Sequence, residues 1–151
     1  MMKKVIAVLA ATTGLVAGAF ADTYNLADVK AHTTFSGVGH VLTGKLGKNV
    51  KISLADGAKF TLRDVTINGV NDSGCMWAGL TCEGNATIIL DGSNIIKGFY
   101  QDYPGIFVPS GKTLTIKGVG SLSTGSSGIG FASGIGGANG LPCGSIVIES
   151  G

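Results

Sequence analysis

The sequence predicts an all-β fold, a parallel β-helix in which short strands stack as successive coils of a solenoid. Three observations predict this fold. A short strand pattern recurs along the chain, glycine is abundant at 26 of 151 residues, and the repeated unit contains strands and glycine turns without a helical periodicity. A single stacked domain is the natural interpretation of a chain of this length.

The repeated strand is clearest at Thr113–Lys117, where polar and apolar residues alternate before Gly118. Alternation with a period of two is typical of a strand with one buried face. Four copies occur, with offsets of 23, 26 and 32 residues between them: 65–69, 88–92, 114–118 and 146–150. A second, shorter strand recurs as Gly79-Leu80, Gly105-Ile106 and Gly134-Ile135.

Aligning the four copies places aliphatic residues in two inward columns. No single coil buries such a face alone, so stacked neighbours would supply the core. The same alignment gives a polar outward column in which opposite charges would stabilise the register by about 0.2–1 kcal/mol per pair. The inward columns are Val65, Ile88, Leu114 and Ile146, and then Ile67, Leu90, Ile116 and Ile148; the outward column is Asn68, Asp91, Lys117 and Glu149.

Residues 1–21 have the pattern of a secretory signal peptide. Lys3 and Lys4 form a basic start, an apolar stretch follows, and Ala19-Phe20-Ala21 is a small-x-small cleavage site before Asp22. Removing the two lysines from 11 basic residues leaves 9, which equals the 9 acidic residues. The mature chain would carry no formal net charge, which argues against nucleic acid as a partner. No membrane span is expected after the signal is removed.

Residues 22–37 have a weak pattern and are the expected N-terminal cap, and 38–151 are the expected β-helix repeats. His32 and His40 have no neighbouring cysteine or third histidine, so we expect both to lie on the surface. The sequence stops at Gly151 directly after a strand. We therefore expect an incomplete coil, completed by further sequence or left as a fragment.

The chain has three cysteines, Cys75, Cys82 and Cys143. In an oxidising compartment Cys75 and Cys82 can close a small disulfide loop. Three reduced, buried thiols are the alternative, and the sequence leaves both open.

Trp77 and Tyr103 occupy the same place in successive copies, two residues before Gly79 and Gly105. One hypothesis is an aromatic platform for sugar rings, supported by Phe99, Tyr100 and Phe107 nearby; the other is an aromatic ladder that only packs at a corner. The ligand-binding candidates are Trp77, Tyr100, Tyr103 and Asp102, in loops at 70–78 and 98–104.

Calcium is a possible cofactor because several carboxylates lie in the loops. Asp72, Glu83 and Asp91 are the candidate ligands, with Asn71 and Asp102 nearby. Their spacing matches no EF-hand loop, so solvated loop carboxylates are the simpler interpretation.

The segments PGIFVPSGKTLTIKG, GIG and CGSIVIESG resemble the repeats of secreted bacterial carbohydrate-binding-domain-containing proteins with a right-handed parallel β-helix. The resemblance covers about residues 38–151 and implies the fold and a carbohydrate ligand. It assigns no catalytic residue.

We therefore expect a secreted, periplasmic or cell-surface module that binds polysaccharide or a surface glycan, or mediates adhesion, without catalysis. The alternatives are a polysaccharide lyase or hydrolase of the β-helix type, or a purely structural stalk. The hydrolases need two converging carboxylates. Asp91 and Glu149 would lie about 10 Å apart across two strand spacings, with Lys117 between them.

Overall fold

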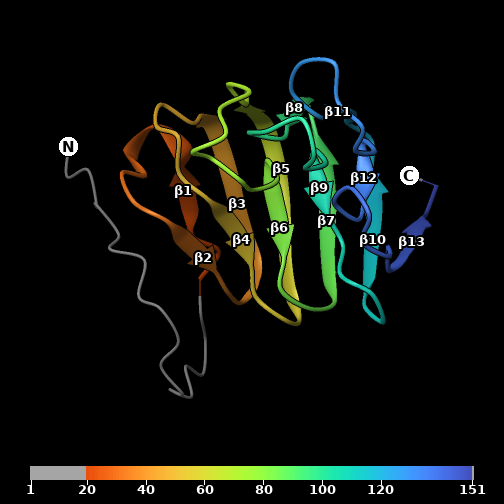
Figure 1. Ribbon diagram of the computed structural model, residues 1–151. Coiled ribbons are helices and arrows are strands. Elements are labelled where there is room, and N and C mark those ends of the chain that lie inside the picture. The colour runs from red at the N-terminus through yellow and green to blue at the C-terminus, as the bar shows by residue number, and fades with distance from the viewer. Residues whose placement is uncertain (1–19, 151) are drawn as a thin grey trace.

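The computed structural model describes residues 20–150, which fold into two sheets of parallel strands (Figure 1). The predicted signal peptide, residues 1–21, lies outside the described residues apart from Phe20 and Ala21. The first sheet contains β1 (Thr23–Asn25), β3 (Val38–Lys45), β5 (Ala58–Ile67), β7 (Ala86–Asp91), β8 (Ser93–Lys97), β10 (Thr113–Gly118), β11 (Ser121–Gly125) and β13 (Ser145–Ile148). The second contains β2 (Thr33–Phe35), β4 (Ile52–Leu54), β6 (Leu80–Cys82), β9 (Ile106–Phe107) and β12 (Ile135–Gly136).

The chain passes alternately between the two sheets. The first sheet has the order β1-β3-β5-β7-β10-β13, and the second has the order β12-β9-β6-β4-β2. Neighbours within a sheet are therefore one circuit apart, where a circuit is one passage of the chain through both sheets. The all-β, parallel-strand prediction is confirmed. Within 20–150 the only helical element is the 3₁₀ turn η1 (Leu26–Asp28).

Residues 22–37 supply the first strand of each sheet. β1 pairs with β3 and β2 pairs with β4, and Leu26 of η1 is fully buried between them and the core. The expectation that His40 lies on the surface is wrong, because its ring is buried. His40 pairs with Phe60 in an inward-facing position of β3.

The register between β5, β7 and β10 has a step of 28 residues. Phe60 pairs with Ile88, and Ile88 pairs with Ile116, so the predicted alignment of Ile88 with Val65 and Leu114 is wrong. A shift of two residues keeps every side chain on the same face of a strand, so alternation alone does not separate steps of 26 and 28. The predicted pairing of Leu114 with Ile146 is confirmed.

Val65 belongs to a different part of the circuit from Ile88, because β5 turns a corner at Asp64. Asp64 has a positive φ of 52°, a conformation that aspartate tolerates better than most residues. Before this corner β5 pairs with β7, and after it Thr66 pairs with Ile95 of β8. Gly92, with φ of 67°, occupies the equivalent corner between β7 and β8.

The core lies between the sheets and is built from inward-facing columns. The recurrent short strand is confirmed, since Leu80 pairs with Ile106 and Ile106 with Ile135. The largest fully buried side chains are aliphatic or phenyl groups, most of them in these columns: Phe35, Phe60, Phe99, Leu26, Leu42, Ile52, Leu54, Leu62, Ile67, Leu80, Ile88 and Ile96.

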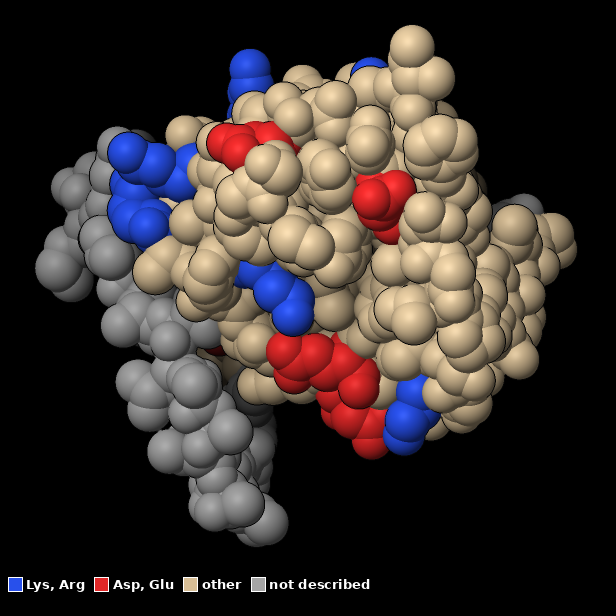
Figure 2. Space-filling view, in the orientation of Figure 1, with Lys and Arg blue, Asp and Glu red and all other residues tan. Residues whose placement is uncertain are grey.

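Opposite charges pair on the outward face, although not as one column. Arg63 binds Asp91 at 2.6 Å, and Lys117 binds Glu149 at 3.5 Å. The predicted Lys117–Glu149 contact is therefore present, and Asp91 pairs with Arg63 in place of Lys117. Figure 2 shows acidic and basic side chains scattered among uncharged residues on the visible face. Across residues 20–150 no helix has both the length and the apolar character needed to cross a bilayer.

Asn94 connects three circuits at the corner after β7. Its side chain is only 1% exposed. Oδ1 accepts from the Val65 backbone N–H at 3.0 Å, and Nδ2 donates to the carbonyl oxygens of Asp91 at 3.2 Å and Ser121 at 3.1 Å. A buried amide with all these partners satisfies backbone groups that the turn would otherwise leave unpaired.

Replacing Asn94 with alanine should lower the free energy of unfolding by about 3 kcal/mol. The substitution leaves buried backbone groups on three circuits without a hydrogen-bond partner. Urea denaturation measures the change. Asn68→Ala is the matched control, since Asn68 is exposed, and should change stability by less than about 0.5 kcal/mol. Equal effects of the two substitutions would contradict this role of Asn94.

Candidate functional site

Three loops leave the first sheet at the same corner and return to the second sheet. They span 68–79, 98–105 and 126–134, and they follow β5, β8 and β11 respectively. We call them the corner loops. In Figure 1 the last of them is the blue loop that projects above β11. Because β5, β8 and β11 stack in register, the loops that follow them are brought side by side.

Hydrogen bonds tie each corner loop to the next. The Asp72 N–H donates to the Phe99 carbonyl oxygen at 3.0 Å, and the Gln101 N–H donates to Oδ1 of Asn71 at 3.1 Å. The Phe131 N–H donates to the Gln101 carbonyl oxygen at 3.2 Å. The sheet register therefore continues into the loops and fixes the positions of their side chains.

Glycine is required where the first two loops begin. A Cβ atom on Gly69 would lie 1.6 Å from the carbonyl oxygen of Gly98, a separation that only a displaced backbone would relieve. The absence of a side chain lets the two loops stack directly.

Trp77 lies near the end of the first corner loop, just before β6. Its ring is half-buried and packs against His32 and Phe99, with ring centroids 5.0 and 5.8 Å apart. Its Nε1 is buried without a hydrogen-bond partner among the described residues. Packing against these two rings is sufficient to explain the position of the Trp77 ring. Its role in binding sugar stays a prediction.

Tyr100 and Tyr103 are held together by a tight turn. The Tyr103 N–H donates to the Tyr100 carbonyl oxygen at 3.0 Å, and both side chains are half-buried. Tyr103 precedes β9 as Trp77 precedes β6, and β6 and β9 are neighbours in the second sheet. Just before these strands, the Gly79 N–H donates to the Pro104 carbonyl oxygen at 3.3 Å. The predicted equivalence of the two aromatic positions is thus present in the structure.

Asp102 lies between the tyrosines and contacts a residue that the sequence analysis missed. The backbone N–H of Asn139 donates to the Asp102 carbonyl oxygen at 2.8 Å, and Nδ2 of Asn139 donates to Oδ1 of Asp102 at 3.2 Å. Asn139 belongs to a glycine-rich run with no periodicity, so the sequence carries no signal that places it beside Asp102. Gln101 was missed because its hydrogen bond to Asn71 forms only when the two loops stack.

The candidate calcium ligands are not brought together. Asp72 accepts from the Gly74 N–H at 2.8 Å, Glu83 accepts from the Thr34 hydroxyl at 3.0 Å, and Asp91 pairs with Arg63. Among residues 20–150, no group of three or more His, Cys, Asp or Glu side chains is placed to hold a metal ion.

All three cysteines are free thiols in the structure, and Cys75 and Cys82 are buried whereas Cys143 is exposed. Burial raises the pKa of the Cys82 thiol to about 12. Burial, and to a smaller extent the Asp72 carboxylate, raise the pKa of Cys75. Both buried thiols therefore resist ionisation, and the thiolate is the reactive form.

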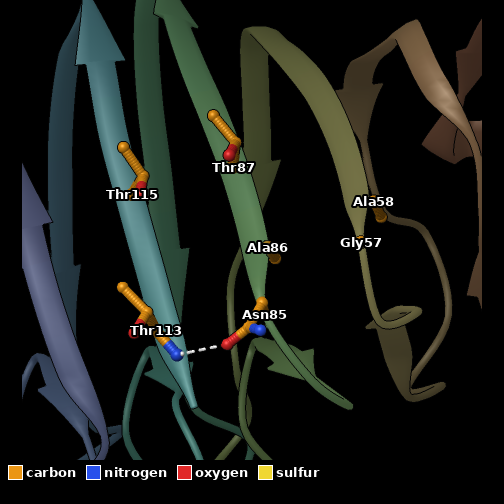
Figure 3. A pocket seen from close by; sticks show the side chains of 7 residues that line it. All are labelled: Gly57, Ala58, Asn85, Ala86, Thr87, Thr113 and Thr115. Carbon is orange, nitrogen blue, oxygen red and sulfur yellow. Dashed lines mark hydrogen bonds between the residues drawn. The ribbon is translucent and has the colours of Figure 1, made fainter.

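A shallow depression lies on the outward face where β5, β7 and β10 begin, with a volume of about 140 Å³. Figure 3 shows that Oδ1 of Asn85 faces the backbone nitrogen of Thr113, which donates to it at 2.9 Å. Thr87 and Thr115 are register partners beside it. Its lining carries amide and hydroxyl groups and no titratable side chain: Gly57, Ala58, Asn85, Ala86, Thr87, Thr113 and Thr115.

Asp91 and Glu149, the outward carboxylates weighed for acid–base chemistry, do not face one another. Each is engaged with a cation of its own, Arg63 and Lys117 respectively. The predicted arrangement, with Lys117 between the two acids, is wrong because Lys117 is in register with Ile89 of β7 and not with Asp91.

The chain matches no family model, no curated protein and no solved structure.

Gly69→Ala should destabilise the fold by about 2 kcal/mol, because its methyl group collides with the Gly98 backbone. Thermal unfolding followed by circular dichroism measures the loss. Gly47→Ala is the control, because a Cβ there meets nothing within 4 Å. A Gly69 variant as stable as the control would contradict the direct stacking of the corner loops.

The native protein should react with a thiol reagent at Cys143 alone at pH 7 to 8. Cys75 and Cys82 should react only after unfolding, because burial blocks access and disfavours their thiolates. Counting labelled thiols by mass spectrometry, in native and in denatured but unreduced protein, measures this. Two thiols that stay unlabelled after denaturation would instead show the Cys75–Cys82 disulfide.

Proposed function

We propose that the chain is a right-handed parallel β-helix. The support is the strand order in both sheets, in which each strand pairs with the strand one circuit before and after it. A right-handed crossover is also the rule for parallel strands in one sheet. The 28-residue step between β5, β7 and β10 is the repeat length on this proposal.

We further propose that it is exported and acts as a non-catalytic module that binds polysaccharide or a surface glycan at the corner loops. The observation that carries this proposal is the position of Tyr100 and Tyr103 beside the anchored groups of Gln101, Asp102 and Asn139. Sugar rings present C–H faces that pack on aromatic rings, and hydroxyl groups that bond to amides and carboxylates. Binding sites combine such apolar surface with a few fixed polar groups.

The charge balance supports a neutral glycan over a charged one. The chain after residue 21 has equal numbers of basic and acidic residues, 9 of each once Lys3 and Lys4 are removed. Long-range electrostatic attraction between a strongly acidic ligand and a protein with no net charge is weak. Hydrogen bonding and ring packing would therefore supply most of the affinity.

The separate ion pairs of Asp91 and Glu149 support binding over hydrolysis, because acid–base cleavage of a glycosidic bond needs two carboxyl groups that face one substrate. Release of reducing sugar from a panel of polysaccharides tests the enzymatic alternative. A lyase or hydrolase would release product, and a binding module would not.

Tyr103→Ala should weaken binding to an insoluble polysaccharide about tenfold, because a truncated aromatic anchor costs more than about 1 kcal/mol. Pull-down of the chain from residue 22 on a set of insoluble glycans measures this, with Tyr100→Ala in parallel. Val38→Ala, an exposed apolar residue remote from the corner loops, should bind like the unaltered chain.

Repeating the pull-down with calcium and with a chelator separates two outcomes. Binding that needs calcium and is lost in Asp102→Asn would assign a metal to this site. A folded protein that binds no glycan in either condition would contradict the proposal and favour a structural stalk.

A further inference from the structure

The backbone of Asp22 is fixed on both sides at the start of the fold. Its nitrogen donates to Nδ1 of His40 at 3.1 Å, and its carbonyl oxygen accepts from the Val41 N–H at 2.8 Å. Thr23, the next residue, begins β1 and pairs with Val41. Among residues 20–150, Asp22 is therefore the first that is hydrogen-bonded to the backbone of β3.

The His40 side chain that binds this nitrogen is buried in the core. It is 8% exposed, and its ring lies 5.4 Å from that of Phe60 and 5.8 Å from that of Tyr24. Gly37 leaves the space that the imidazole fills, since a Cβ there would lie 2.6 Å from Nε2. The next residues in the same column are Phe60 and Ile88, so a polar ring at position 40 needs a polar partner.

The residue bound to His40 is also the first residue after the small-x-small motif Ala19-Phe20-Ala21. We propose that His40 is the hydrogen-bond acceptor for the α-amino group that signal-peptide removal creates on Asp22. This inference rests on the proposed export of the chain. Hydrolysis of the Ala21–Asp22 peptide bond consumes one water and yields a carboxylate on Ala21 and a protonated amine on Asp22.

Cleavage strengthens a contact that the uncut chain already makes. The amide nitrogen of Asp22 has one N–H, whereas the ammonium group has three and carries a positive charge. Charge-assisted hydrogen bonds are about twice as strong as neutral ones. The Asp22 carboxylate lies 3.8 Å from Nδ1 of His40 and supplies the opposite charge next to the new ammonium group.

Tyr24 lies next to that carboxylate. Its hydroxyl group donates to Oδ2 of Asp22 at 3.5 Å. Burial, followed by the charge of Asp22, raises the pKa of Tyr24, so the hydroxyl remains a donor across the neutral range. Phe20, by contrast, is 90% exposed. Removal of the signal therefore breaks no core packing by Phe20 and completes a cluster of four polar groups at the end of the first sheet.

The experiment compares chains that differ only at the N-terminus. A chain with Asp22 as its free N-terminus, released from a cleavable fusion, should melt about 3 °C above the chain that begins at Phe20. Acetylation of the Asp22 amine should abolish this gain. His40→Phe, which keeps an aromatic ring in the column and removes the acceptor, should melt at the same temperature with either N-terminus.

Amine reactivity supplies a second readout that does not depend on stability. The α-amine of the Asp22 chain should react with an amine-specific ester several-fold more slowly than in His40→Phe. Equal melting temperatures and equal amine reactivity in the two backgrounds would overturn the docking of the N-terminus. N-terminal sequencing of the exported protein is a separate test, because another first residue would refute cleavage at Asp22 and leave the glycan-binding test unaffected.

Discussion

The parallel register between circuits is the constraint on which the rest of the structure depends. Once Phe60 pairs with Ile88 and Ile88 with Ile116, every inward position is repeated by the neighbouring circuits. A buried column is therefore mostly apolar, and a polar member such as His40 needs a polar partner. Every corner is repeated as well. Asp64 and Gly92 therefore both adopt positive φ angles, and Asn94 satisfies backbone groups from three circuits at one point.

The register also builds the candidate site, because the corner loops inherit it from β5, β8 and β11. Residues as distant in sequence as Asn71, Gln101 and Phe131 form one hydrogen-bonded row. Tyr100 and Tyr103 are consequently positioned by the sheets beneath them and by the tight turn between them. On the proposed function, a polysaccharide chain would extend across the corner loops, along the direction in which the circuits stack.

The sequence was sufficient to predict an all-β fold with parallel strands, because alternation at Thr113–Lys117 and its copies reports directly which face is buried. It was insufficient for the register, because a shift of two residues preserves that alternation. The corner at Asp64 divides β5 between two neighbours, and no local pattern marks it. The burial of His40 could not be predicted because it depends on the pairing of His40 with Phe60 in the neighbouring strand. The contact of Asn139 with Asp102 could not be predicted because it forms only when the loops stack.

The 28-residue register is tested most directly by paired cysteine substitutions on the outward face of β7 and β10. Neighbouring strands of a sheet lie about 4.8 Å apart, within the Cα separation that a disulfide spans. Thr87→Cys with Thr115→Cys, which are register partners, should form a bond under mild oxidation that peptide mapping by mass spectrometry identifies. Thr87→Cys with Thr113→Cys should bond poorly. The opposite preference would show a 26-residue step and contradict the arrangement of columns, corners and loops described above.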